Sequence, residues 1–179
     1  MGPLDDGHFV DVFVTSVQRH KVNRRIVRPG ESSTLALNLF TNSTISVNNG
    51  HNDDDDDDVT DDNNNNSTIP LSKIIRKGMV LLSNVDPDSI CQYFQAQIYS
   101  MPHSSAVISL GSSAIVYIEN VRQCGVILAI KHKEQIYADE SASVIIRFIR
   151  RPEYIRNGYR LLLQFERAKA IGHVTKVFF

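Results

Sequence analysis

Residues 150–176 decide the fold of this chain and read Arg150-Arg-Pro-Glu-Tyr-Ile-Arg-Asn-Gly-Tyr-Arg-Leu-Leu-Leu-Gln-Phe-Glu-Arg-Ala-Lys-Ala-Ile-Gly-His-Val-Thr-Lys176. Pro152 and the Asn157-Gly158 pair mark turns, because proline fixes φ and an Asn-Gly pair tolerates the positive φ of a tight turn. Residues 159–165 and 170–179 have a composition that favours strands. The stretch therefore predicts a turn, a strand, a basic turn and a closing strand.

Strand-like runs recur along the rest of the chain. Residues 9–17 and 33–39 are rich in β-branched and apolar residues, and a basic run and the Pro29-Gly30 turn lie between them. Five later runs are also predicted as strands: Met79–Leu82, Tyr93–Ser100, Ser113–Glu119, Cys124–Ile130 and Ala142–Ile149. The last four and the closing pair make about six strands, which is typical of a small antiparallel barrel. The predicted fold class is all-β.

The final stretch resembles the third domain of elongation-factor-Tu-like translational GTPases, and in particular the family of GTP-binding proteins 1 and 2. The matching residues are, in order, Pro152-Glu153-Tyr154, Gly158, Arg160-Leu161 and Arg167-Ala-Lys-Ala-Ile-Gly-His-Val-Thr-Lys176. Gln95-Ala-Gln-Ile98 and Val121-Arg-Gln-Cys-Gly-Val-Ile127 are similar to further patterns of that domain. The resemblance implies that residues 90–179 form a six-stranded antiparallel barrel like domain III of an elongation factor.

The first part of the chain resembles the second domain of the same family. The matching segments are Val14–Lys21, Val27–Glu31, Thr34–Leu37 and Ile75-Arg-Lys-Gly-Met-Val-Leu81. The resemblance implies that residues 1–83 form the C-terminal half of a domain II-like β-barrel and that residues 84–89 are a linker. Because no match to the opening strands of that barrel is found, we expect a fragment, a truncated gene model or one piece of a longer polypeptide.

Residues 42–68 consist mainly of Asn, Asp, Ser and Thr and include six consecutive aspartates. Such a segment buries too little apolar surface to offset its ordering entropy, so we expect a disordered, low-complexity insertion. The whole chain has 19 basic and 20 acidic residues, and removing the 8 acidic residues of this tract leaves 12, for a formal net charge of +7. A basic body is compatible with a phosphate-rich partner, and equally with a solvated surface.

The expected environment is the cytoplasm. No apolar run is long enough to cross a bilayer, and residues 1–7 have neither the basic segment nor the apolar core of a secretory signal. Cys91 and Cys124 are the only cysteines, and their spacing favours two free thiols in a reducing compartment. We therefore expect no membrane partner.

The motifs of nucleotide chemistry are missing from the sequence. It contains no Gly-x-x-x-x-Gly-Lys-Ser/Thr loop, no Asp-x-x-Gly switch and no Asn-Lys-x-Asp base-reading motif. Its six histidines have no metal-ligand spacing. The family that the chain resembles binds GTP and magnesium and is a GTPase. These residues offer no catalytic, cofactor or metal site, so the chain alone should have no activity.

Three cations are the candidate nucleic-acid-binding residues. In elongation-factor-Tu-like proteins the third domain contacts the T stem of tRNA, partly through an Arg-Glu-Gly turn before the last strand. This chain has Gln164-Phe165-Glu166 there, which removes a cation and a glycine that lets backbone approach phosphate closely. The resemblance then leaves Arg160, Arg167 and Lys169 as nearby cations for RNA.

The resemblance implies an accessory β-barrel region of an elongation-factor-like GTP-binding protein. Such a region would dock on the GTPase domain of the full-length protein and engage tRNA, other RNA or the ribosome, in translation elongation or RNA turnover. The alternative is a stand-alone protein-interaction or scaffold module that binds neither nucleotide nor RNA.

Overall fold

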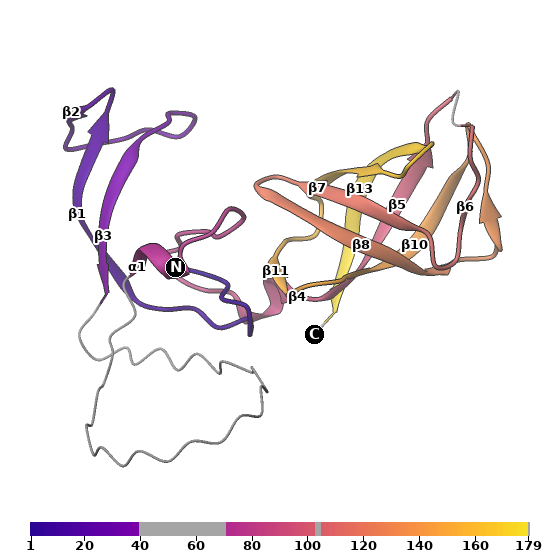
Figure 1. Ribbon diagram of the computed structural model, residues 1–179, viewed down its shortest axis with the longest axis horizontal. Coiled ribbons are helices and arrows are strands. Elements are labelled where there is room, and N and C mark those ends of the chain that lie inside the picture. The colour runs from indigo at the N-terminus through magenta and orange to yellow at the C-terminus, as the bar shows by residue number, and fades with distance from the viewer. Residues whose placement is uncertain (40–70, 103–104, 179) are drawn as a thin grey trace, which may run out of the picture. The chain divides into compact units, whose positions relative to one another are not determined.

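The computed structural model describes residues 1–39, 71–102 and 105–178 (Figure 1). It divides into two compact units, one made of Met1–Phe9 with Arg76–Phe179 and the other of Val10–Ile75. Strands dominate the described residues, beside one four-residue helix, α1 (Leu71–Ile74), and the 3-10 turn Pro87–Ser89. The all-β prediction is confirmed. The predicted insertion, residues 42–68, lies outside the described residues.

The larger unit contains a closed antiparallel barrel with the strand order β10-β5-β13-β12-β7-β8. Its six strands are β5 (Tyr93–Ser100), β7 (Ser113–Ile118), β8 (Val121–Ile130), β10 (Ser141–Phe148), β12 (Arg160–Gln164) and β13 (Lys169–Phe178). Two short pairs accompany the barrel, β4 (Ile90–Cys91) with β11 (Glu153–Tyr154) and β6 (Ile108–Ser109) with β9 (Gln135–Ile136). The barrel confirms the six strands expected of the C-terminal part.

The barrel interior is filled because its strands alternate between the two faces of the wall. In β5, Phe94, Ala96 and Ile98 are buried, whereas the residues between them are only half-buried. The ring of Phe94 packs 5.1 Å from that of Phe148 on β10. Burying one such side chain stabilises a fold by about 1.5–3 kcal/mol, so this alternation is the main source of the barrel's stability.

Strands β5 and β13 approach each other closely at Gly172. A Cβ atom built on Gly172 would lie 2.0 Å from the carbonyl oxygen of Gln97 and 2.9 Å from the Cα of Ile98. Glycine is therefore required here by the space available, since the two backbones occupy the place of any side chain. This contact lies where the closing strand meets the first long strand of the barrel.

Two strands begin three residues away from the predicted position, and one predicted strand does not form. Strand β8 begins at Val121, three residues before the predicted Cys124, because the chain reverses within Glu119-Asn120 and Glu119 adopts a φ of 49°. The predicted strand Met79–Leu82 is wrong, since Val80 makes only an isolated bridge with Gly2. The N-terminal strand begins at Val12 rather than at residue 9.

The smaller unit contains a three-stranded sheet of order β2-β1-β3 among its described residues, with β1 (Val12–Arg19), β2 (Val22–Asn23) and β3 (Thr34–Leu39). Its two-residue turn, His20-Lys21, has φ values of 52° and 65°. The chain passes from one unit to the other at Phe9/Val10 and again at Ile75/Arg76. The assignment of residues 1–83 to a domain II-like barrel and of 84–89 to a linker remains a prediction.

Candidate functional site on the barrel wall

The structure separates the three predicted cations into two places. Arg160 is the first residue of β12 and pairs with His173 on β13. Arg167 lies in the turn between the two strands, and Lys169 begins β13 at the other end of the hairpin, opposite Gln164. With a rise of about 3.4 Å per residue, the two ends of this ladder lie roughly 13 Å apart. Arg167 and Lys169 thus share one site that does not include Arg160.

Arg167 and Lys169 line a small hollow at the β12–β13 turn, with a volume of about 240 Å³. Its other lining residues are Met101, Pro102, Gln164, Phe165, Glu166 and Ala168. The backbone carbonyl of Arg167 accepts a hydrogen bond of 3.2 Å from the N–H of Ser105, which fixes the turn. The hollow is thus lined by two cations, and one carboxylate, that of Glu166, lies beside them.

A larger groove of about 920 Å³ lies on the outer wall over β5, β13, β12 and β7. Its floor is a row of outward-facing side chains on neighbouring strands, because residues that pair across a sheet point to the same face. This aromatic row consists, in strand order, of Tyr117, Leu162, Ile171 and Tyr99. A second row beside it contains Arg160, His173 and Gln97. Sequence reasoning found Arg160 but missed both tyrosines, which look like ordinary strand residues.

The two tyrosines of the aromatic row are held at their hydroxyl ends. The Tyr99 hydroxyl donates to the Asp139 carboxylate, and this hydrogen bond raises the pKa of Tyr99. The Tyr117 hydroxyl donates to Oε1 of Gln164 over 3.4 Å. The Arg122 guanidinium, opposite Tyr117 on β8, lies 5.7 Å from the Tyr117 ring centroid, within cation–π range. The row therefore combines fixed aromatic rings with an adjacent cation.

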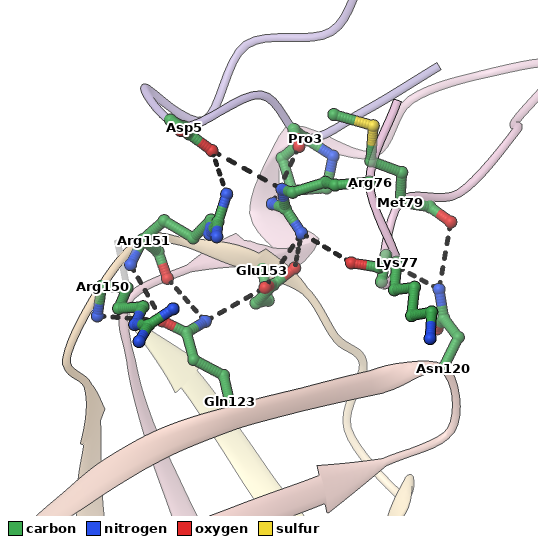
Figure 2. A network of polar contacts seen from close by, with 11 residues as sticks. Pro3, Asp5, Arg76, Lys77, Met79, Asn120, Gln123, Arg150, Arg151 and Glu153 are labelled. Carbon is green, nitrogen blue, oxygen red and sulfur yellow. Dashed lines mark hydrogen bonds and ion pairs between the residues drawn. The ribbon is translucent and has the colours of Figure 1, made fainter. Parts of the chain in front are cut away.

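A buried polar network, shown in Figure 2, ties three distant segments of the larger unit together. Nη1 of Arg76 donates to both carboxylate oxygens of Glu153, at 3.1 Å each, and Nη2 donates to the carbonyl of Pro3 over 3.0 Å. The exposed fraction of the Glu153 side chain is 4%, and that of the Arg76 side chain is 15%. Asp5 contacts the guanidiniums of Arg76 and Arg151 from the solvent side.

Gln123 completes this network from inside the barrel wall. Its Nε2 donates to Glu153 over 3.0 Å and to the Arg151 carbonyl over 3.1 Å, and its Oε1 accepts from the N–H groups of Arg150 and Arg151, each over 2.9 Å. Every polar atom of the Gln123 amide is thereby used. Arg76, Gln123 and Glu153 belong to three of the segments that carried the family resemblance, and the fold brings them together.

Burial is the main cause of the pKa shifts of two groups in this region, Glu153 and Cys91. Burial raises the pKa of Glu153, and the nearby Arg76 and Arg151 charges and the Gln123 amide oppose this shift. Burial, with a smaller contribution from the Glu153 charge, raises the pKa of the Cys91 thiol to about 12. Cys91 is therefore a poor nucleophile at neutral pH, since the thiolate is the reactive form.

A metal-binding cluster and a membrane-spanning helix are both absent from the described ranges. Within residues 1–39, 71–102 and 105–178, His, Cys, Asp and Glu side chains do not gather in a group of three or more that could hold a metal ion. None of the helices in these ranges combines the length and the hydropathy that a membrane span requires.

Comparison with known proteins finds a similarity to GTP-binding proteins. It is 32% identical over 177 residues to GTP-binding protein 2 of Mus musculus and of Homo sapiens, a match that covers 99% of this chain. The chain is related to GTP-binding proteins 1 and 2. GTP-binding protein 1 of Xenopus laevis is 28% identical over 178 residues. No family model matches the chain.

The chain spans about a quarter of the relatives that it matches. The aligned region covers 24% of each GTP-binding protein 2 and 22% of the Xenopus GTP-binding protein 1. The predicted resemblance to the GTP-binding protein 1 and 2 family is confirmed over nearly the whole chain. The aligned region includes the six-stranded barrel, and the relatives are longer proteins.

Proposed function

We propose that this chain is an accessory β-barrel region of a GTP-binding protein, which docks on a GTPase domain and engages RNA. The observation that carries the proposal is the similarity over 99% of the chain to proteins named GTP-binding protein 2, of which it covers 24%. The sequence itself contains no phosphate-binding loop. The barrel would therefore act as a rigid surface beside a nucleotide-binding domain, in the cytoplasm.

The RNA part of the proposal rests on the charges of the barrel wall. Arg160, Arg167 and Lys169 are exposed on the β12–β13 hairpin, and His173 lies beside Arg160. Cations near phosphates release condensed counterions, so they supply affinity that falls as salt rises. The partner would be tRNA, another RNA or ribosomal RNA, as in translation elongation or RNA turnover.

The proposal is tested by titrating labelled tRNA with the purified chain at about 50 and 200 mM salt. We expect saturable binding that weakens with salt, and a smaller salt dependence when Arg160, Arg167 and Lys169 are replaced by Gln. The matched control replaces Lys131, Arg147 and Arg150, which are also exposed. The control should bind as the unchanged chain does.

Two results would contradict the RNA proposal. A chain that circular dichroism shows to be folded and that binds no tRNA leaves only the protein-docking part, which is also the prediction of the scaffold alternative. Equal loss in the two triple variants would show that net charge, not the hairpin, determines binding. The docking part is tested separately, by mixing the chain with the GTPase domain of GTP-binding protein 2 and measuring association with GTP or GDP present.

A further inference from the structure

We propose that the aromatic row on the barrel wall is a stacking surface for single-stranded nucleic acid. The row consists of Tyr117, Leu162, Ile171 and Tyr99, on strands β7, β12, β13 and β5. The choice of RNA over DNA rests on the function proposed above. The position of the proposed stacking surface does not rest on that function, since it follows from the side chains on the barrel wall.

The geometry of the row suits bases laid across a sheet. Tyr117 and Tyr99 are separated by three steps between neighbouring strands, or roughly 14 Å at about 4.8 Å a step. The two rings can therefore stack on bases that are not adjacent in the strand. Leu162 and Ile171 lie between them, and Ile171 has 46% of its surface exposed. Sheets that bind single-stranded RNA likewise stack bases on aromatic side chains of their strands.

The rings are held in place before any ligand arrives. The Tyr99 hydroxyl is tied to Asp139 and the Tyr117 hydroxyl to Gln164, so each ring is fixed at its far end as well as at the backbone. A ring that is already ordered loses less conformational entropy on binding, which favours affinity. The hydrogen bonds also direct the polar atoms of both rings to the edges of the row.

The charges around the row complement a phosphate backbone. Arg122 lies at the β8 end, against the Tyr117 ring, and Arg160 and His173 form the adjacent row. Lys169 lies on the other side of the aromatic row, two residues before Ile171 on β13. One acidic residue, Glu119, lines the groove. A nucleic-acid strand would thus have bases over the apolar floor and phosphates beside cations on both sides.

A protein segment is the competing occupant, because tyrosine and arginine are also enriched at the centres of protein interfaces. The charge balance favours nucleic acid: three cations surround the floor, Arg122, Arg160 and Lys169. The acids beside it are two, Glu119 in the groove lining and Asp139 at the Tyr99 hydroxyl. The apolar floor is also narrow, because the second row beside it is polar.

The test measures binding of a labelled oligouridine of about ten nucleotides to the full 179-residue chain. Replacing either tyrosine, as Tyr99→Leu or Tyr117→Leu, should weaken binding roughly tenfold, because stacking on one base is lost while apolar volume is kept. Tyr99→Phe and Tyr117→Phe retain the ring and should bind within about threefold of the unchanged chain. The matched control is Tyr93→Leu, since Tyr93 is on the same strand as Tyr99 but outside the groove.

The outcomes separate this proposal from the function on which it rests. If the unchanged chain binds tRNA and the Leu variants bind oligouridine as it does, the aromatic row is not the site, although the RNA function stands. If the folded chain binds neither RNA, both proposals fail. If the Leu variants keep RNA binding but lose association with the GTPase domain, the row is a protein surface. Equal affinity for oligodeoxythymidine would support the stacking surface and remove the preference for RNA.

If the Leu variants fail to fold, as circular dichroism would show, the proposal is tested with the Phe variants and Arg122→Gln. The Phe variants should then keep binding, and Arg122→Gln should weaken it and reduce its salt dependence, by about 0.7 in the slope of log affinity against log salt for one lost phosphate contact. Unchanged affinity and slope in Arg122→Gln would contradict a phosphate beside Tyr117.

Discussion

The guanidinium of Arg76 lies 3.1 Å from both carboxylate oxygens of Glu153, although the two residues are 77 positions apart. The pair is shielded from solvent, and it joins the segment after Ile75 to the short strand β11 (Figure 2). Asp5 contacts the same guanidinium from an exposed position, where its side chain has 78% of its surface accessible. One cation therefore has a buried and an exposed carboxylate partner.

Glu153→Gln should destabilise the chain much more than Asp5→Asn. The first change leaves a buried guanidinium without its charged partner, which costs about 3–5 kcal/mol. The second removes an exposed partner, which is worth about 1 kcal/mol or less. The free energies of unfolding are measured by urea titration at neutral pH. Equal losses in the two variants would mean that solvent screens the buried pair as well as the exposed one.

Gln123→Glu should lower stability in a pH-dependent way. The new carboxyl would lie beside Glu153, in place of an amide that now donates to it over 3.0 Å. Burial and the like charge would raise its pKa above the usual value of about 4.3, so the unfolded chain would lose the proton at a lower pH than the folded chain. The variant should therefore be close to the unchanged chain at about pH 4 and lose stability as pH rises.

The measurement for Gln123→Glu is the urea midpoint of variant and unchanged chain at several pH values. Gln123→Leu is the control, because it removes the same amide without adding a titratable group and leaves the N–H groups of Arg150 and Arg151 unpaired at every pH. Its loss should also grow as pH rises, because Glu153 loses an amide donor that lowers its pKa, but by less than in Gln123→Glu, which adds a second carboxylate. A loss in Gln123→Glu that depends on pH no more than that of Gln123→Leu would contradict the like-charge argument.

Gly172→Ala should disrupt the seam between β5 and β13. Its Cβ would lie 2.0 Å from the Gln97 carbonyl oxygen, so the two backbones must separate, at a cost of about 3 kcal/mol or more. Gly158→Ala adds the same methyl group at a positive φ of 86° with nothing within 4 Å, and should cost about 1 kcal/mol. Thermal unfolding compares the two. A smaller loss for Gly172→Ala than for Gly158→Ala would contradict the close approach.

Cys91 should resist thiol reagents until the chain unfolds. Its pKa is raised to about 12, so almost no thiolate forms in the folded chain at about pH 8. Labelling with and without urea, followed by peptide mass analysis, measures this, and Cys124, which is half-buried, serves as the internal reference. Fast labelling of native Cys91 would contradict its burial.

The raised pKa of Cys91 also affects stability at alkaline pH. The thiol in the unfolded chain ionises near its usual value of 9.0, whereas the folded chain keeps its proton until about 12. The unfolded state is therefore favoured as pH rises through this window, and the stability that the neutral thiol contributes is lost progressively. Cys91→Ala, which does not titrate, should lose less stability than the unchanged chain over the same window.

The local sequence pattern predicted the long strands of the barrel, but it did not predict the contacts between buried polar residues. Strands β5, β12 and β13 were predicted within one residue of their bounds, because their residues alternate or are β-rich along the strand. Gln123 was predicted to lie in a connection, because a glutamine between two strands looks like loop sequence. In the structure it points inward, where Glu153 and two backbone N–H groups satisfy it.

The candidate sites could be predicted only in part, because the local sequence does not show which residues the strand pairing brings together. Arg160, Arg167 and Lys169 are near one another in sequence, yet a hairpin puts Arg160 at one end of its ladder and Lys169 at the other. Conversely, Tyr99 and Tyr117 are on strands that are not sequence neighbours of β12 and β13. They join one row only because β13 pairs with β5 and β12 pairs with β7.

The position of β13 has a consequence for how the protein is made. This strand is the last of the barrel in the chain, yet it lies between β5, the first, and β12. While the ribosome still covers residues 169–178, β5 and β12 expose their backbone hydrogen-bonding groups, and such open edges invite pairing with other chains. The barrel therefore closes only after residues 169–178 have emerged. A premature stop before residue 169 would leave a product prone to aggregation rather than a smaller barrel.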